Sequence, residues 1–281
     1  MEDKITLSPS RARKWIRCKK SYYWRYYQHL TRIQKGVPMS LGSVASETLA
    51  GYYSRPDRTQ VSLDDCLARA LDNLSPHPDV LRKSPSLGKD WNKITNVSHY
   101  LFSKYHDWAY PKDTGFEMEA VERSQQVELT SNISLLAIPD AIVSQDGSLL
   151  VFEHKVRSRY HSGDFGIDYQ SVGSCLVSGS IGTLYNVLEY SHAKFYREPI
   201  VRSEEELDYF RNIYIRIGEE ILSTPPEYLY PQPFKRCSCE YWELCNAEMT
   251  GLDLDDIIGE LYQKSIRPKE KEEVGETEGG G

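Results

Sequence analysis

The chain has 281 residues, with hydrophobic and charged fractions of 40% and 27% that are ordinary for a globular protein able to bury a core. No stretch approaches the roughly 18 apolar residues of a membrane span, and the first 11 residues lack the apolar segment of a secretory signal. We therefore expect a cytoplasmic protein with no membrane partner. The net charge of −7 is only an average, because residues 10–36 carry nine Lys or Arg and no acidic residue.

Hydrophobic periodicity and turn residues predict a mixed order of helices and strands along the chain. This order predicts an α/β fold with a central mixed sheet flanked by helices. We expect one domain over residues 1–265 and a disordered, charged tail over residues 266–281, where the composition is simple and polar. The predicted elements are helices at about 10–29, 41–53, 63–74 and 91–110, strands at about 121–129, 134–144 and 148–156, a helix at 169–177, strands at 183–190 and 193–198, and a helix at 203–222.

Two carboxylates and a lysine come together in the predicted hairpin. Glu153 and Lys155 are two residues apart on one strand, so their side chains share a face. The turn at Asp146–Gly147 places the strand of Asp140 beside them. An exposed Glu–Lys pair would produce the same triplet. With Asp140 added, however, the three groups suit a hard cation such as Mg²⁺ or Mn²⁺ and metal-assisted phosphodiester hydrolysis.

The basic N-terminal segment interleaves cationic and aromatic residues. Basic groups bind phosphates and aromatic faces stack on unpaired bases, so this helix is a candidate surface for single-stranded DNA. The alternative is an aromatic core with a solvated basic face, and we expect Trp15 and Tyr22 to be buried in either case. The candidate DNA-binding residues are Arg11, Arg13, Lys14, Arg17 and Tyr23.

Three of the six cysteines, Cys237, Cys239 and Cys245, lie within nine residues. In a chain of this size without a secretory signal, such a cluster favours metal binding over disulfides. A fourth thiolate from elsewhere would complete a [4Fe–4S] or a zinc site, and free thiols are the remaining alternative. Cys66 and Cys175 are expected in the core.

Five segments in order resemble the RecB-like branch of the PD-(D/E)XK nuclease superfamily. The segment IPDAIVSQDGSLLVFEHK resembles the core nuclease motif, and LSPSRARKWIRCKKSYYWRYYQ and SLGSVASETLAGYY resemble the opening segments. Asp168-Tyr169-Gln170 resembles the glutamine motif, and RCSCEYWELC resembles the cysteine cluster of iron–sulfur members, including the CRISPR-adaptation nucleases. The resemblance implies a restriction-endonuclease-like fold with a cysteine-rich metal-cluster region at its C-terminal end.

The resemblance also assigns roles to residues of this chain. Asp140, Glu153 and the backbone carbonyl of His154 would bind Mg²⁺ or Mn²⁺. Lys155 would be the catalytic lysine, and Gln170 would position the substrate or the lysine. Cys18, Cys237, Cys239 and Cys245 would hold a [4Fe–4S] cluster, with zinc as the alternative.

Two positions depart from the family pattern. Ser46 stands where a metal-binding histidine is usual, so that Glu47 or a water would have to fill that place, and Ser174 stands where a tyrosine follows the glutamine. We expect a metal-dependent deoxyribonuclease, an exonuclease acting on single-stranded DNA ends in repair, recombination, replication or CRISPR adaptation. Its protein partners would be a helicase or proteins of CRISPR adaptation or recombination. The alternative is a nucleic-acid-binding protein of the same fold with weakened catalysis, or a subunit of a larger DNA-processing complex.

Overall fold

The structure is a computed structural model that describes residues 4–33, 37–76, 85–231, 237 and 239–264. The chain divides into two compact units, each with its own hydrophobic core. The larger unit comprises Met1–Arg13 and Lys35–Ser223, and the smaller unit comprises Lys14–Gln34 and Thr224–Gly281. The tail predicted over residues 266–281 lies outside the described residues.

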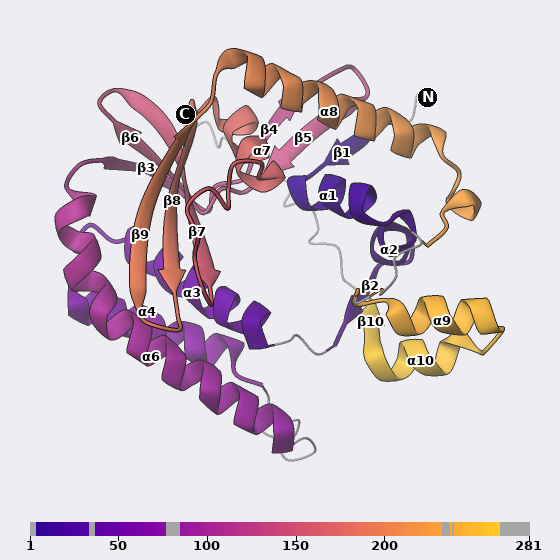
Figure 1. Cartoon of the computed structure of the whole chain (residues 1–281), viewed down its shortest axis with the longest axis horizontal. Helices are drawn as coiled ribbons and strands as arrows, with labels where there is room; N and C mark the ends of the chain where they lie inside the picture. Colours follow the sequence, from indigo (N-terminus) through magenta and orange to yellow (C-terminus); the bar gives the residue numbers. More distant parts are fainter. Residues whose placement is uncertain (1–3, 34–36, 77–84, 232–236, 238, 265–281) are drawn as a thin grey trace, which may run out of the picture. The chain divides into compact units, whose positions relative to one another are not determined.

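A five-stranded mixed sheet is the centre of the larger unit (Figure 1). Strands β7 and β8 are parallel and all other neighbours are antiparallel, which confirms the predicted mixed sheet. The turn between β6 and β7 is made by Asp146 and Gly147, whose φ angles of 50° and 78° suit a tight hairpin. In sheet order the strands are β3 (Glu117–Val121), β6 (Ala141–Gln145), β7 (Ser148–Arg157), β8 (Gly182–Glu189) and β9 (Lys194–Val201).

A second sheet of three strands corrects two strand predictions. Its order is β1 (Ile5–Leu7), β5 (Ile133–Ala137) and β4 (Gln125–Glu128). The strand predicted over 134–144 is in fact β5 followed by β6, which belong to different sheets. The break falls at Pro139, which has no backbone N–H to continue a ladder. The strand predicted over 121–129 likewise joins the end of β3 to β4.

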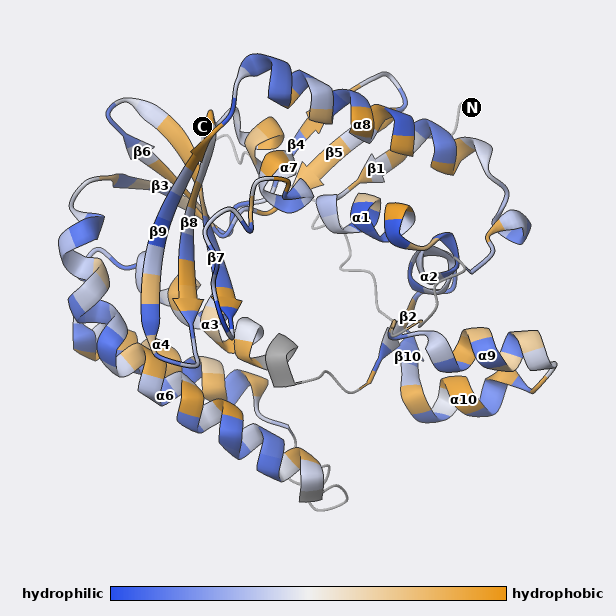
Figure 2. Cartoon of the chain, in the orientation of Figure 1, coloured by the Kyte–Doolittle hydropathy of each residue, from blue (hydrophilic) through white to orange (hydrophobic). Residues whose placement is uncertain are grey.

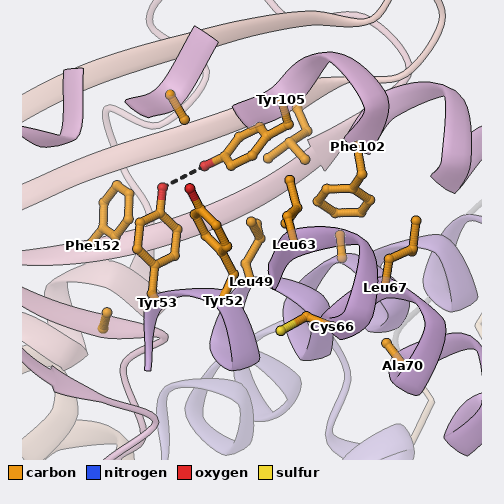
Figure 3. Packing of buried hydrophobic residues seen from close by; sticks show 14 of the residues in the cluster. Leu49, Tyr52, Tyr53, Leu63, Cys66, Leu67, Ala70, Phe102, Tyr105 and Phe152 are labelled. Atoms are coloured by element: carbon orange, nitrogen blue, oxygen red, sulfur yellow. Dashed lines mark hydrogen bonds between the residues drawn. The ribbon is translucent and has the colours of Figure 1, made fainter. Parts of the chain in front are cut away.

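Helices α3 and α6 pack against one face of the five-stranded sheet, and α4 packs on these two helices. Their apolar side chains join Phe152 of β7 in a single core, part of which Figure 3 shows. In Figure 2 the ribbons of α6 and α8 alternate between hydrophobic and hydrophilic residues, as amphipathic helices do. The helices of this unit are α3 (Val37–Tyr53), α4 (Gln60–Leu74), α6 (Pro85–Asp113), α7 (Tyr169–Ser178) and α8 (Glu204–Ser223).

The smaller unit contains short elements around a core of Trp24, Leu30 and Tyr241. The helix predicted over 10–29 is interrupted at Cys18, whose extended backbone (φ −167°, ψ 114°) cannot continue an α-helix. The pieces are α1 (Pro9–Arg17), within which the boundary of the two units falls, α2 (Lys19–Tyr22) and the π-helix η1 (Tyr23–Tyr27). The remaining elements are β2 (Leu30–Arg32), the 3-10 helix η2 (Pro226–Tyr228), α9 (Trp242–Thr250), α10 (Leu254–Leu261) and β10 (Tyr262–Lys264), which pairs with β2.

Candidate active site

The β6–β7 hairpin brings Asp140 to Glu153. Ala141 lies opposite Phe152, so Asp140, one residue earlier, lies beside the next position of β7. Its Oδ2 accepts a hydrogen bond of 2.8 Å from the backbone N–H of His154. The side chain is thereby fixed to the strand that carries the other candidate residues.

Glu153, Lys155 and Gln170 form one hydrogen-bonded group on the α7 side of β7. The Lys155 ammonium donates to Glu153 Oε1 over 2.8 Å, and Gln170 Nε2 donates to the same oxygen over 2.8 Å. Lys155 Nζ also lies 3.5 Å from Gln170 Oε1. Glu153 is only 2% exposed, so its charge is held by these donors and little by water.

The electrostatics of the site favour an added cation. Burial, followed by the neighbouring charge of Glu153, raises the pKa of Asp140 to about 7. Burial also raises the pKa of Glu153, although the Lys155 ammonium opposes the shift. Because burial disfavours the ionised form of both carboxylates, a bound cation would stabilise them. Their oxygens are the donors that Mg²⁺ and Mn²⁺ prefer.

The side chains alone supply a small donor set. In the described part of the chain, no group of three or more His, Cys, Asp or Glu side chains is arranged to hold a metal ion. This is compatible with Mg²⁺, which commonly takes one or two carboxylates and fills its remaining positions with waters and substrate phosphate. Asp140 and Glu153 thus fit a hard divalent cation that also needs oxygens from outside the side chains.

Ser46 lies on α3 and is partly exposed. The neighbouring Glu47 accepts a 2.6 Å hydrogen bond from Asn73 Nδ2. Burial raises the pKa of Glu122, and the charge of Glu47 adds to the shift. Glu122 in turn raises the pKa of Asp140, as the smallest of several causes.

Glu122 was not singled out from the sequence, and Asp168 was named there only as part of the glutamine motif, without a role. Glu122 follows β3 with a φ of 44°, and its backbone N–H donates to the carbonyl of Asp140 over 3.1 Å. No local pattern marks it, because its place follows from the pairing of β3 with β6. Asp168 Oδ2 lies 3.4 Å from Lys155 Nζ. The signal for Asp168 was its place just before α7, where an aspartate is a favoured N-cap.

His154 faces away from Glu153 and Lys155, because successive side chains of a strand point to opposite faces. Its ring stacks on Tyr53 at 5.5 Å, and its Nδ1 lies 2.9 Å from Asn186 Nδ2. Burial, followed by the charge of Arg197, lowers the pKa of His154 to about 3. The imidazole is therefore neutral at physiological pH and takes part in a buried polar network on the α3 side of the sheet.

That network is centred on Arg197 of β9. The guanidinium bonds Asp113 Oδ1 over 2.7 Å and Tyr53 Oη over 3.0 Å, and also contacts Asn186 Oδ1. The Tyr53 hydroxyl donates to Asp113 Oδ2 over 2.9 Å. Figure 3 shows the hydrogen bond between the Tyr53 and Tyr105 hydroxyls in this region. Most of the buried polar groups on the α3 side of β7 thus have hydrogen-bond partners. These hydrogen bonds help to hold β7 in place.

Three of the five candidate DNA-binding residues form local contacts within their own units. Arg11 donates to the carbonyl of Thr6 over 2.9 Å, and Lys14 forms a 2.5 Å ion pair with Glu240. The Tyr23 hydroxyl accepts from Gln28 Nε2 over 2.7 Å. Arg13 and Arg17 are exposed. Trp15 and Tyr22 are buried, as predicted.

The four clustered cysteines all belong to the smaller unit. The sulfurs of Cys237 and Cys239 lie 3.5 Å apart, and Cys245 Sγ accepts from Trp24 Nε1 over 3.4 Å. Burial raises the pKa of the Cys239 thiol to about 12, with smaller contributions from the Cys237 and Cys245 thiols. Cys18 is buried. Among the residues that the structure describes, these thiols do not form a group of three or more arranged to hold a metal ion, so the predicted cluster region is not shown.

Cys66 and Cys175 are core residues, as predicted. Cys66 belongs to the core of the larger unit. The Cys175 thiol is buried and donates to the carbonyl of Gly182 over 3.3 Å.

Comparison with known families is consistent with the site. The model of the PD-(D/E)XK nuclease superfamily matches residues 6–246, so the chain belongs to that superfamily. It is a superfamily of nucleases that typically use Mg²⁺. A solved structure, that of SSO0001, is similar with 10% sequence identity and a TM-score of 0.34, over 82% of this chain and 84% of that one. No curated protein matches the chain. Among the described residues, no helix has the length and apolar composition needed to cross a bilayer.

Proposed function

We propose that this protein is a metal-dependent deoxyribonuclease that hydrolyses phosphodiester bonds at the Asp140 site. The observation that carries the proposal is the convergence of Asp140, Glu153, Lys155 and Gln170, through hydrogen bonds of 2.8 Å to Glu153 Oε1 and the hairpin that places Asp140 beside it. Two carboxylates and an ammonium group are the groups that metal-assisted hydrolysis of a phosphodiester needs.

In this proposal Asp140, Glu153 and the backbone carbonyl of His154 hold Mg²⁺ or Mn²⁺. The bound cation would polarise the scissile phosphate and lower the pKa of a bound water. The Lys155 ammonium would donate to the phosphate or to the attacking water, close to Glu153. Gln170 would fix the orientation of Glu153 through its 2.8 Å hydrogen bond. The proposal is supported by the raised pKa values of the two buried carboxylates, whose ionised forms a bound cation would stabilise.

The proposed substrate is DNA, with single-stranded ends cut exonucleolytically. This preference, and partners such as a helicase or proteins of CRISPR adaptation or recombination, follow from the resemblance to RecB-like nucleases. Arg11, Arg13, Lys14, Arg17 and Tyr23 remain the proposed DNA contacts. Arg13 and Arg17 are the strongest of them, because both are exposed and lie four residues apart on α1, which places them on one face of the helix.

This part of the proposal has its own test. The substitutions Arg13→Glu and Arg17→Glu together should weaken binding of single-stranded DNA and flatten its dependence on salt concentration, because fewer counterions are released. Unchanged binding would remove α1 from the DNA-binding surface.

We further propose that Cys18, Cys237, Cys239 and Cys245 hold a [4Fe–4S] cluster, with zinc as the alternative. The [4Fe–4S] proposal rests on the resemblance to iron–sulfur members. The 3.5 Å separation of the Cys237 and Cys239 sulfurs supports only the zinc alternative, in which one ion binds both thiolates. A tetrahedral site with Zn–S bonds of about 2.3 Å places two sulfurs about 3.8 Å apart. Analysis of iron, sulfide and zinc in anaerobically purified protein distinguishes the two, and Cys245→Ser should lower the metal content. A wild-type protein with neither metal contradicts this part.

The experiment that tests the nuclease activity compares the wild type with Lys155→Ala on end-labelled single- and double-stranded DNA, with Mg²⁺ or Mn²⁺. The control is Lys104→Ala, which removes an exposed lysine of the larger unit. We expect metal-dependent cleavage that Lys155→Ala abolishes and Lys104→Ala leaves unchanged, with a product ladder that gives the polarity. Intact DNA binding without cleavage would instead support the non-cleaving alternative and direct attention to Ser46.

A further inference from the structure

Asp168 directs its two carboxylate oxygens to different groups. Oδ1 accepts the backbone N–H of Gln170 over 3.0 Å, which caps the N-terminus of α7. Oδ2 lies 3.4 Å from the Lys155 ammonium. A helix cap needs only one oxygen, so the second interaction is not explained by the helix.

The position of Asp168 is supported from β8. The hydroxyl of Tyr185 donates to Asp168 Oδ2 over 3.4 Å, and it also lies 2.5 Å from Ser171 Oγ. Ser171 in turn donates to the backbone carbonyl of Asp168 over 3.2 Å. Tyr185 is fully buried and stacks on Phe165, with ring centroids 4.2 Å apart.

The loop that precedes Asp168 is also held. The Arg202 guanidinium donates to the carbonyls of Gly166, over 2.8 Å, and of Phe165, over 3.3 Å. Arg202 itself is buried. The backbone therefore enters α7 from a fixed point, which limits how far the backbone of Asp168 can move from Lys155.

Lys155 consequently lies between two carboxylates, with Glu153 at 2.8 Å and Asp168 at 3.4 Å. An ammonium group that paired with Glu153 alone would neutralise a carboxylate that the proposed function needs for the cation. We infer that Asp168 is a positioning residue for the reaction: it shares the Lys155 ammonium with Glu153 and keeps it at the site, so that the ammonium is not paired with Glu153 alone when Glu153 binds the metal. This inference rests on the proposed function.

The test uses Asp168→Asn, which keeps a good helix cap and removes the charge. Asp253→Asn is the matched control, because Asp253 caps α10 in the same way, accepting from the N–H of Asp255 over 2.9 Å. We expect Asp168→Asn to lower kcat about 10–100-fold, as loss of a residue that orients a metal ligand does. It should raise the Mn²⁺ concentration that gives half-maximal activity, with the KM for DNA and the melting temperature unchanged. Asp253→Asn should change none of these quantities.

A double substitution separates action through Lys155 from action through the helix. In a Lys155→Met background, where we expect no cleavage, Asp168→Asn should cause no further change in the affinity for Mn²⁺, measured by titration without DNA, because the partner is already absent. The same change in Mn²⁺ affinity in both backgrounds would overturn the inference, as would a wild-type kcat in the single variant.

A second readout does not depend on cleavage. In protein labelled with ¹⁵N-lysine, the Lys155 side-chain resonance, assigned with Lys155→Met, should shift in Asp168→Asn and stay in place in Asp253→Asn. An unshifted resonance in Asp168→Asn would overturn the inference. A wild-type protein that does not cut DNA would refute the proposed function, and the resonance would then decide by itself whether Asp168 holds the lysine.

Discussion

Removal of one partner of the buried ion pair between Arg197 and Asp113 should strongly destabilise the unit that carries the candidate site. The two side chains are 10% and 3% exposed, and Nη2 lies 2.7 Å from Oδ1. Substitution of Arg197 by Met removes the guanidinium and retains much of the aliphatic volume. It leaves the Asp113 carboxylate buried, with Arg58 at 3.9 Å as a weaker partner.

Removal of one partner from a buried ion pair costs about 3–5 kcal/mol, because the remaining charge has lost both water and its partner. Arg58 offsets some of that cost, so we expect Arg197→Met to lower the free energy of unfolding by about 3 kcal/mol, near the lower end of the range. Asp113→Asn should also destabilise the protein, because it leaves the guanidinium without its carboxylate. The double variant should be less destabilised than the sum of the two, by about 2 kcal/mol, since neither charge is then left alone.

Urea unfolding followed by circular dichroism measures these differences as shifts of the midpoint at constant slope. The control is Arg211→Met, which breaks an exposed pair between Arg211 and Asp208, 40% and 71% exposed with 3.4 Å between Nε and Oδ1. That variant should change stability by less than about 0.5 kcal/mol. A cost for Arg197→Met as small as that of the control, or strictly additive single substitutions, would refute the reasoning.

Three other predictions concern the larger unit. Asp140→Asn should abolish cleavage but raise the melting temperature in EDTA at pH 8 by several degrees. The pKa of Asp140 is about 7 in the folded protein against an ordinary value of 3.8. The ionised carboxylate therefore destabilises the folded protein increasingly as pH rises from 3.8 to 7. An unchanged melting temperature in Asp140→Asn would contradict this. The folded-state pKa of His154 is depressed, about 3 against 6.5, so the stability advantage of the wild type over His154→Asn should shrink as pH falls through that window in urea titrations. An advantage that stays constant over that window would contradict this. Gly173→Ala should destabilise by about 1–3 kcal/mol, because the added Cβ would lie 2.7 Å from a buried tyrosine hydroxyl; Gly259→Ala, in open space on α10, should instead be neutral or stabilising in thermal melts.

Local patterns in the sequence determined the part of the site that lies on one hairpin. Asp146 and Gly147 specify a tight turn, and strand alternation then places Glu153 and Lys155 on one face and His154 on the other. Asp140 follows from the same hairpin, although its strand is shorter than predicted because Pro139 interrupts the ladder. These features depend on backbone geometry over fewer than about twenty residues, which is why a sequence is sufficient to predict them.

The tertiary structure alone decided which distant groups complete the site. Asp168 reaches Lys155 because β8 pairs in parallel with β7 and the intervening α7 packs against both strands. Asp113 and Arg197 form an ion pair although 84 residues separate them. Lys14 pairs with the distant Glu240, whereas Arg13 and Arg17 on the same helix are exposed. Ion pairs and hydrogen bonds between distant segments depend on how whole helices and strands pack together. The local spacing of residue types does not predict that packing.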